Sequence, residues 1–204
     1  MASASPRRRE LLSKLGIELL VYEPDIDESF PPGRDDYDVL CMELARRKIE
    51  AVLGRPELGD CRWFLAADTT VLVKNRVLGK PENPGEALEF LNILAGAVHT
   101  VVTGVALYDR RINKYYPDFE EARVRIAKMT KREKEWYIET GEWQGVAGGY
   151  RIQEKGALFI ESIRGTYTNV MGLPMRTVYG IMRLANYPIG IKSSGNGRHR
   201  APGK

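Results

Sequence analysis

The residues Trp-Phe-Leu-Ala-Ala at positions 63–67 form an unbroken apolar run that ends at Asp68. Such a run is typical of a strand buried on both faces of a sheet, because both of its faces meet core. A carboxylate that directly follows this strand is predicted to lie at the strand's end, where ligands bind in open α/β sheets. The run therefore predicts a layered α/β domain in which Asp68 is a candidate functional residue.

Helix-like and strand-like patterns alternate along the rest of the chain. Capping residues and apolar stripes predict helices over 5–15, 36–52, 83–94, 130–140 and 173–185. Apolar or alternating segments predict strands over 17–22, 98–108, 122–126 and 158–163, and a hairpin that joins 71–73 to 77–78 through a three-residue loop. This order predicts the α/β class, with a mixed twisted sheet and flanking helices.

The composition excludes several kinds of site. The 204 residues include only two cysteines, Cys41 and Cys61, and two histidines, His99 and His199. This rules out a disulfide scaffold, a cysteine-rich zinc module and a zinc site made of three histidines. Since 43% of the residues are hydrophobic, the chain is able to bury a sizeable core. The chemistry that is left belongs to carboxylates, amines, guanidiniums and a hard metal ion.

The net charge of +4 is confined to the C-terminus. Residues 191–204 hold four basic residues and no acidic one, so that 27 basic and 27 acidic residues remain in 1–190. A neutral body argues against a nucleic-acid partner. We predict that 191–204 is a disordered basic tail, with a weak anion-binding arm as the alternative. No signal peptide or membrane-spanning run is recognised, so we expect a cytoplasmic protein without a membrane partner.

Hydroxyl and guanidinium groups gather at the start of the first predicted helix, where Ser3, Arg7 and Arg8 lie close together in the sequence. Free N–H groups at a helix N-terminus and arginine side chains together make an anion site. Arginine opposes the helix dipole at such positions, so the placement suits binding of a polyphosphate better than helix stability. A solvated basic N-terminus is the alternative interpretation.

Further charged residues stand at unusual places. Lys48 lies on or beside the apolar stripe of its predicted helix, and Lys80 is held between Gly79 and Pro81. Each lysine alone is explained by a side chain that reaches for solvent, but with Arg7 and Arg8 they would provide four cations around one triphosphate. The loop carboxylates, Asp25, Asp27 and Glu28, read as solvated on their own. Carboxylates from two separate loops would nevertheless suit Mg²⁺, which also binds phosphate and water.

A glycine-rich segment at 145–156 contains Gln153. Its side-chain amide presents an acceptor beside donors, which matches the N3–H and the neighbouring carbonyl of uracil or thymine. Such an amide is able to flip, so it does not fix base specificity alone, and a plain turn remains the alternative for the segment.

Eight motifs occur in order along the chain: 2–8 (ASASPRR), 25–28 (DIDE), Lys48, 67–69 (ADT), 79–81 (GKP), 103–105 (TGV), 147–153 (AGGYRIQ) and 169–174 (NVMGLP). Together they resemble the Maf proteins, which are nucleoside triphosphate pyrophosphatases first described as inhibitors of septum formation. The resemblance extends over about 2–184 and has no counterpart for the tail.

The resemblance implies a fold, a reaction and partners. The fold is that of the inosine triphosphate pyrophosphatases, with two lobes around a mixed sheet and the nucleotide in the cleft between them, here as one domain over 1–190. The reaction is cleavage of the α–β phosphoanhydride to a nucleoside monophosphate and pyrophosphate, with a divalent cation, Mg²⁺ or Mn²⁺. The family also suggests a homodimer.

The same resemblance implies roles for individual residues. Asp68 would accept the proton or position the water, and it would act with Glu28 and Lys80. The phosphate and metal cluster would comprise Ser3, Arg7, Glu28, Lys48 and Lys80, with the metal on Asp68 and Glu28. Arg8, Thr69 and Gln153 occupy the positions that mark specificity in the branch acting on dTTP and UTP, whereas the branch acting on 7-methyl-GTP differs there.

Two departures accompany the resemblance. Family members usually carry a short apolar strand before the serine motif, so we expect either an earlier start or a sheet that lacks this strand. Ile49 follows Lys48 where the family tends to have alanine. The sequence thus predicts a pyrophosphatase acting on dTTP and UTP, including modified pyrimidine nucleotides. The alternatives are a 7-methyl-GTP pyrophosphatase and a non-catalytic, nucleotide-binding regulator of cell division.

Overall fold

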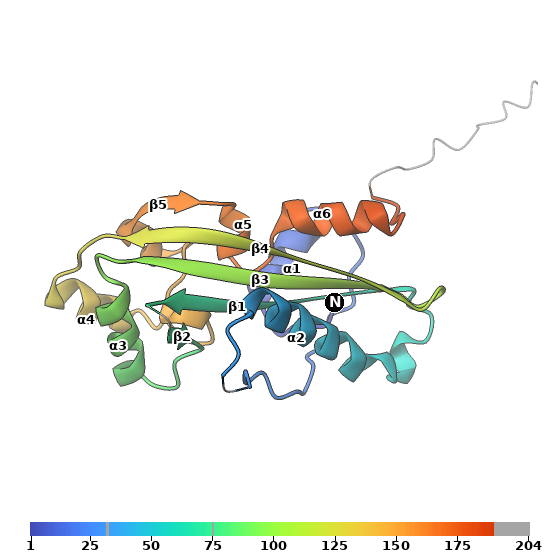
Figure 1. Cartoon of the computed structure of the whole chain (residues 1–204), viewed down its shortest axis with the longest axis horizontal. Helices are drawn as coiled ribbons and strands as arrows, with labels where there is room; N and C mark the ends of the chain where they lie inside the picture. The colour runs from blue at the N-terminus through green and yellow to red at the C-terminus, as the bar shows by residue number, and fades with distance from the viewer. Residues whose placement is uncertain (32, 75, 190–204) are drawn as a thin grey trace, which may run out of the picture.

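The computed structural model describes residues 1–31, 33–74 and 76–189, and the predicted tail at 191–204 lies outside them. At the centre of this described part is a five-stranded sheet in the order β2-β1-β3-β4-β5 (Figure 1). Its strands are β1 (Trp63–Val73), β2 (Arg76–Leu78), β3 (Val98–Asp109), β4 (Lys114–Ile126) and β5 (Ile160–Arg164). The helices are α1 (Pro6–Ser13), α2 (Tyr37–Leu53), α3 (Pro84–Leu94), α4 (Lys131–Glu139), α5 (Tyr167–Val170) and α6 (Met175–Leu184), with 3-10 turns η1 (Pro56–Leu58), η2 (Ala147–Gly149) and η3 (Lys155–Phe159). The predicted α/β class is confirmed.

The strand β1 continues well beyond the apolar run. Thr69, Thr70 and Val71 are β-branched and extend the strand to Val73, because such side chains favour a pleated backbone. Asp68 therefore lies in the middle of β1, directly opposite Gly104 of β3. The prediction that Asp68 ends its strand is wrong, and the rule for carboxyl ends of parallel strands does not apply to it.

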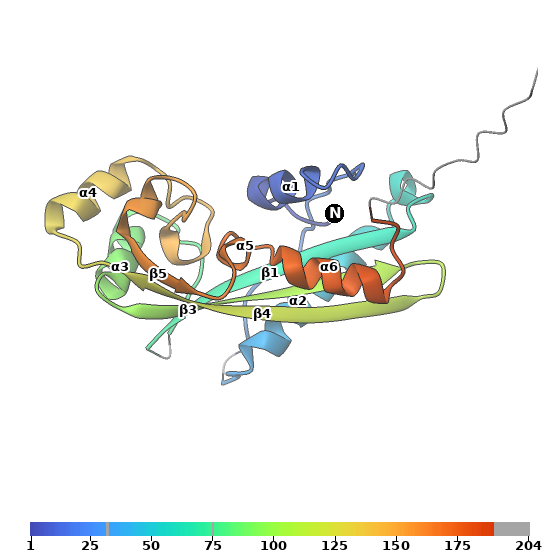
Figure 2. The same cartoon turned by 90° about the horizontal axis from the view of Figure 1, so that it is seen from above.

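Successive residues of β1 point to opposite faces of the sheet, as the strand repeat requires. Phe64 and Ala66 pack with α2 on one face, while Leu65 and Ala67 join the core with α1 and α6 on the other. Figure 2 shows α3 and α4 near one end of the sheet, α1 over its middle, and α6 from the middle toward the other end. Continuing the alternation, Asp68 belongs to the α2 face and Thr69 to the α1 face.

Gly104 lets α2 lie directly on the sheet. A Cβ atom at this position would stand 2.4 Å from main-chain atoms of Cys41 and Met42, which no side chain tolerates. The thiol of Cys41 also contacts the carbonyl oxygen of Val102 at 3.8 Å. This close approach brings the buried side of α2, including Lys48, onto the face that carries Asp68.

The outer edge of β1 is paired at two separate places. Ala2 forms parallel single-residue bridges with Ala66 and with Tyr22, and β2 pairs antiparallel with β1 from Val71 onward. Every ladder between the named strands is antiparallel, so parallel pairing enters the sheet only through Ala2 among the described residues. Between these two places, no described residue pairs with the outer edge at 67–70.

Other predictions differ in detail. The strand predicted at 17–22 is wrong, since within it only Tyr22 forms a bridge. Val73 pairs with Arg76, so Arg76 belongs to the strand rather than to the hairpin loop, of which Asn75 lies outside the described residues. The capping box of Thr130 and Glu133 is confirmed at α4. None of the helices in the described ranges is long and apolar enough to span a membrane.

Candidate active site

A cleft of about 960 Å³ opens where the outer edge of β1 is unpaired. Its wall is formed by the start of α1, by the loop before α2, by β1 and by the segment around η2. All nine residues to which the resemblance gives a role line this one cleft: Ser3, Arg7, Arg8, Glu28, Lys48, Asp68, Thr69, Lys80 and Gln153. The other two loop carboxylates, Asp25 and Asp27, do not line it. The chain thus gathers side chains from positions 3 to 153 at one place.

A chain of ion pairs runs along one side of the cleft. The ammonium of Lys48 lies 2.5 Å from Asp68 Oδ1 and 2.6 Å from Glu28 Oε1. The other oxygen of Glu28 lies 2.6 Å from Lys80 Nζ. Lys48 and Asp68 are 3% and 7% exposed, so their pair is buried, whereas the Lys80 side chain is 57% exposed. Two lysines and two carboxylates here neutralise one another.

Glu28 is held as a carboxylate by its neighbours. Burial alone would raise the pKa of Glu28, but hydrogen bonds and charges from Lys48 and Lys80 outweigh it and lower the pKa to about 2. Glu28 therefore stays ionised at neutral pH and presents both oxygens to cations.

Guanidinium groups also line the cleft. Arg7, Arg8 and Arg151 line it, and none of them forms a salt bridge with a carboxylate of the described residues. Burial, then the charges of Arg151 and Arg8, lower the pKa of Arg7 to about 10, which still leaves it cationic at neutral pH. These guanidiniums thus carry positive charge that no described carboxylate pairs with, and together they suit an anion.

Arg8 is more deeply buried than Arg7 and is held by neutral partners. Its Nε donates to the carbonyl oxygen of Gly172 at 2.6 Å, and its Nη2 donates to Thr69 Oγ1 at 2.9 Å. Its Nη1 also reaches Ser3 Oγ at 3.5 Å. Burial lowers the pKa of Arg8, and the charges of Asp68 and Glu28 oppose that shift. Arg8 therefore links α1 to β1 and to the turn after α5.

Sequence reasoning missed two residues beside the cleft. Arg151 lies two positions before Gln153, and its Nε is buried with no hydrogen-bond partner among the described residues. Thr103 is fully buried on β3 and lies 3.0 Å, oxygen to oxygen, from Thr69. Both residues occur inside motifs that the sequence analysis quoted, yet nothing local to either motif indicates what the side chain contacts.

The carboxylates fit a divalent cation in their chemistry. Glu28 and Asp68 converge on one ammonium, that of Lys48, so their oxygens lie close together in the cleft. Within the described residues there is no cluster of three or more His, Cys, Asp or Glu side chains. Two carboxylates are nevertheless the protein ligands that Mg²⁺ takes when substrate phosphates and water complete its shell.

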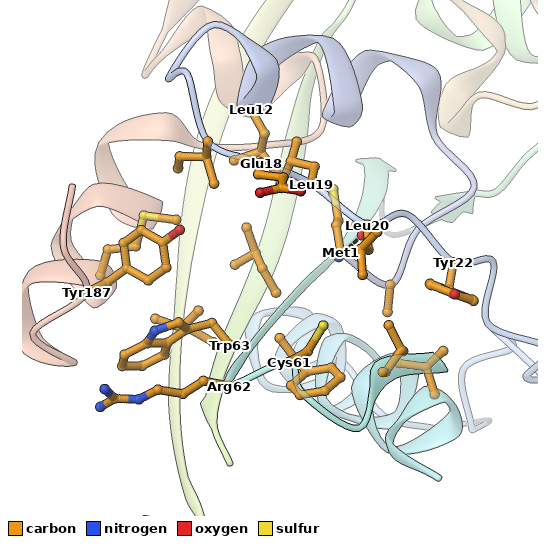
Figure 3. A pocket seen from close by; sticks show the side chains of 18 of the residues that line it. Met1, Leu12, Glu18, Leu19, Leu20, Tyr22, Cys61, Arg62, Trp63 and Tyr187 are labelled. Atoms are coloured by element: carbon orange, nitrogen blue, oxygen red, sulfur yellow. Dashed lines mark hydrogen bonds between the residues drawn. The ribbon is translucent and has the colours of Figure 1, made fainter. Parts of the chain in front are cut away.

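A second pocket, of about 340 Å³, lies between α1, α6 and the start of β1 (Figure 3). Apolar side chains dominate its wall, including Leu12, Trp63 and Tyr187, whose ring meets the Trp63 ring at 5.4 Å. Arg62 pairs with Asp109 at 2.7 Å, and the amino group of Met1 donates to the Leu20 carbonyl. The other charged residues in its wall, Glu18 and Asp60, are acidic, so this pocket does not resemble a phosphate site.

Comparison with known proteins decides the family. The model of the family described as Maf-like protein matches residues 1–185. The chain belongs to the Maf family. Every residue that lines the larger cleft of this Maf-family chain falls inside the matched range.

Curated Maf-family relatives match nearly the whole chain. A protein of Ruegeria sp. (strain TM1040) is 38% identical over 190 residues, covering 93% of this chain and 95% of the relative. A protein of Thermoanaerobacter sp. (strain X514) is 41% identical over 183 residues, covering 90% of this chain and 94% of the relative. One from Clostridium botulinum (strain Hall) is 37% identical over 182 residues, covering 89% and 94%. Each of these relatives is named dTTP/UTP pyrophosphatase.

Proposed function

We propose that this Maf-family chain hydrolyses nucleoside triphosphates at the α–β phosphoanhydride, with dTTP and UTP preferred. The observation that carries the proposal is the buried Lys48–Asp68 pair, which lies in one cleft with the guanidiniums of Arg7 and Arg151. A cleft that joins a salt-bridged carboxylate to cations without carboxylate partners suits hydrolysis of a polyphosphate. The names of the relatives give the base class.

The cations bind the phosphates and stabilise the leaving group. The triphosphate binds to Arg7, Lys48 and Lys80, and Ser3 is a neutral hydrogen-bond partner at the start of α1. Charge develops on pyrophosphate as it leaves, and cations placed there beforehand lower the barrier because they need no rearrangement. The two lysines and two carboxylates neutralise one another, so the guanidiniums leave the cleft with a net positive charge. A metal-bound triphosphate, which remains anionic, is therefore attracted.

Asp68 holds the attacking water. Its Oδ1 is taken by Lys48, while Oδ2 accepts no hydrogen bond from the described residues and is left to accept one from water. Water oxygen attacks the α-phosphorus, the bond to the α–β bridging oxygen breaks, and pyrophosphate leaves with that bond's electron pair. The proton of the water passes to Asp68 or, where Asp68 only positions the water, to solvent.

Glu28 and Asp68 would hold a divalent cation, Mg²⁺ or Mn²⁺. When bound, such an ion neutralises phosphate charge and polarises the phosphoryl oxygens. Glu28 suits this task because its low pKa keeps it ionised, and because it faces both lysines rather than an apolar surface.

Base selection falls to Arg8, Thr69 and Gln153. Arg8 and Thr69 are joined by a hydrogen bond of 2.9 Å, and Gln153 lines the same cleft from the opposite segment. An amide and a hydroxyl together are able to match the donor and acceptor edge of uracil or thymine. The homodimer stays a prediction from the resemblance, and the cytoplasmic location stays a prediction from the sequence, in which no targeting segment is recognised. The use of modified pyrimidine nucleotides also stays a prediction.

The test is a nucleotide panel with the intact chain. Pyrophosphate release is measured from dTTP, UTP, CTP, GTP and 7-methyl-GTP, with Mg²⁺ or Mn²⁺ and with a chelator. We expect dTTP and UTP to give the highest kcat/KM, the chelator to abolish release, and label from heavy-oxygen water to enter the nucleoside monophosphate. Release of orthophosphate would place cleavage at another bond. Preference for 7-methyl-GTP, or binding without hydrolysis, would favour the alternative functions and overturn the proposal.

A further inference from the structure

Thr103 stands behind the base-selecting residues and has no role in the function proposed above. It is fully buried on β3, and it does not line the cleft. Strand register places it directly opposite Thr69 of β1, and the hydroxyl oxygens of the two residues are 3.0 Å apart. Of its two side-chain hydrogen-bond partners among the described residues, Thr69 and Asn169, Thr69 is the one that lines the cleft.

The acceptor beyond Thr103 is rigidly placed. Thr103 Oγ1 donates to the main-chain carbonyl of Asn169 at 3.3 Å. Asn169 is itself fully buried, and its side-chain amide donates to the Val101 carbonyl at 3.1 Å. A hydrogen bond from Asn169 N–H to the Thr166 hydroxyl also caps α5. The carbonyl that receives the Thr103 hydrogen is thus fixed by the fold.

These contacts determine which way each hydroxyl points. A guanidinium only donates, so Arg8 Nη2 must donate to Thr69 Oγ1. A threonine hydroxyl has one hydrogen, and Thr103 gives its own to Asn169. Thr103 is then able only to accept from Thr69. The hydrogen bonds consequently run in one direction, from Arg8 to Thr69, to Thr103 and to Asn169.

Because these hydrogen bonds run in this direction, the Thr69 hydroxyl presents a lone pair to the cleft and has no hydrogen left to donate there. A ligand atom that meets it must be a donor, as N3–H of uracil and thymine is, whereas N3 of cytosine is an acceptor. We propose that Thr103 is a positioning residue that fixes Thr69 as an acceptor and thereby selects bases with N3–H. This inference rests on the proposed function and adds a specificity residue to it.

The test compares two nucleotides in matched variants of the whole chain. Thr103→Val removes the hydroxyl at nearly constant shape and frees the Thr69 hydrogen, so the ratio of kcat/KM for UTP over CTP should fall about tenfold. Thr103→Ser keeps a hydroxyl and should retain the ratio. Thr177→Val is the control, because that hydroxyl also donates to a partner, Glu120 at 3.0 Å, but lies outside the cleft.

If Thr103 were merely structural, Thr103→Val would lower kcat/KM for UTP and for CTP by the same factor. An unchanged ratio of the two kcat/KM values would therefore overturn the inference while the proposed function stands. If Thr103→Val does not fold, the same ratio of kcat/KM for UTP over CTP is measured in Thr103→Ala, and that ratio decides. A second readout uses 3-methyl-UTP, which lacks N3–H. The wild type should disfavour it against UTP by about tenfold or more, and Thr103→Ala should reduce that discrimination. A wild type that releases pyrophosphate from no nucleotide overturns the proposed function and this inference together.

Discussion

The ammonium of Lys48 on α2 lies 2.5 Å from Asp68 Oδ1 on β1, and both side chains are almost fully buried. A buried ion pair contributes little net stability, because desolvation of two charges offsets their attraction. Removing one partner is costly, since the remaining charge stays buried without compensation. The pair therefore explains little about why the chain folds, and its place in the cleft is more simply explained by chemistry.

On the proposed function, Asp68→Asn should lower kcat by about 10²–10⁴-fold while nucleotide binding is largely kept, because the amide keeps the shape but loses the charge that would hold the water. Steady-state pyrophosphate release and calorimetric binding of a non-hydrolysable nucleotide measure the two effects. Asp109→Asn is the matched control, since Asp109 is also buried but pairs with Arg62 outside the cleft. Near-normal turnover in Asp68→Asn would remove Asp68 from the mechanism.

Lys48→Met and Lys80→Met should differ sharply in stability although both lysines contact Glu28. Lys48→Met leaves Asp68 buried without a cation and should cost about 3–5 kcal/mol. Lys80 has a side chain that is 57% exposed, and Lys80→Met should cost only about 0–1 kcal/mol because water screens the pair. Urea unfolding gives both values. Equal losses would contradict the burial of the Lys48 pair.

Gly104→Ala should destabilise the protein by about 2–4 kcal/mol, because the new methyl group would meet the α2 backbone rather than a movable side chain. Turnover should also fall, since α2 carries Lys48. Gly180→Ala provides the control within α6, where nothing lies within 4 Å of the added Cβ. That change should stabilise by about 0.5–1 kcal/mol through helix propensity. A neutral Gly104→Ala in thermal and urea unfolding would refute the close approach.

His99 should make stability depend on pH. Burial lowers its pKa to about 4, and its Nε2 lies 2.7 Å from the Tyr150 hydroxyl oxygen. Below its ordinary pKa of 6.5 the unfolded chain gains a proton that the folded chain refuses, so stability is full above that pH and falls as the pH drops toward 4. From about pH 7 to pH 5 this contributes a loss of about 2 kcal/mol. Urea unfolding of His99→Gln should show a correspondingly smaller difference between the two pH values.

Gln153→Ala should reduce selectivity for UTP and dTTP more than it reduces hydrolysis of triphosphates in general, by about tenfold or more in relative kcat/KM. The reason is that the proposed function assigns the amide to the base edge and not to the reacting phosphate. Gln144→Ala is a matched control, because Gln144 also lines the cleft and is not assigned to the base. An equal loss on every nucleotide would show that Gln153 only supports its loop.

Much of the fold could be predicted from local patterns. The helices α2, α3, α4 and α6 have recognisable caps or apolar stripes, and the ends of α4 follow from Thr130, Glu133 and Gly141. Such signals act over a few residues and therefore survive in the sequence. The prediction of a strand at 17–22 is wrong because apolar composition does not guarantee a neighbouring strand to pair with. In this segment only Tyr22 forms a bridge.

Some features of the candidate site, like some features of the fold, follow from local sequence, and others do not. The residue types alone establish which charged and polar groups are available, and the alternation of a strand places Asp68 and Thr69 on opposite faces of β1. Three relationships follow from the tertiary fold instead: Asp68 lies within its strand, Lys48 reaches it, and Thr103 contacts Thr69 from behind. Those relationships depend on how closely elements distant in sequence approach, as α2 does at Gly104, and no local pattern of residues encodes that distance.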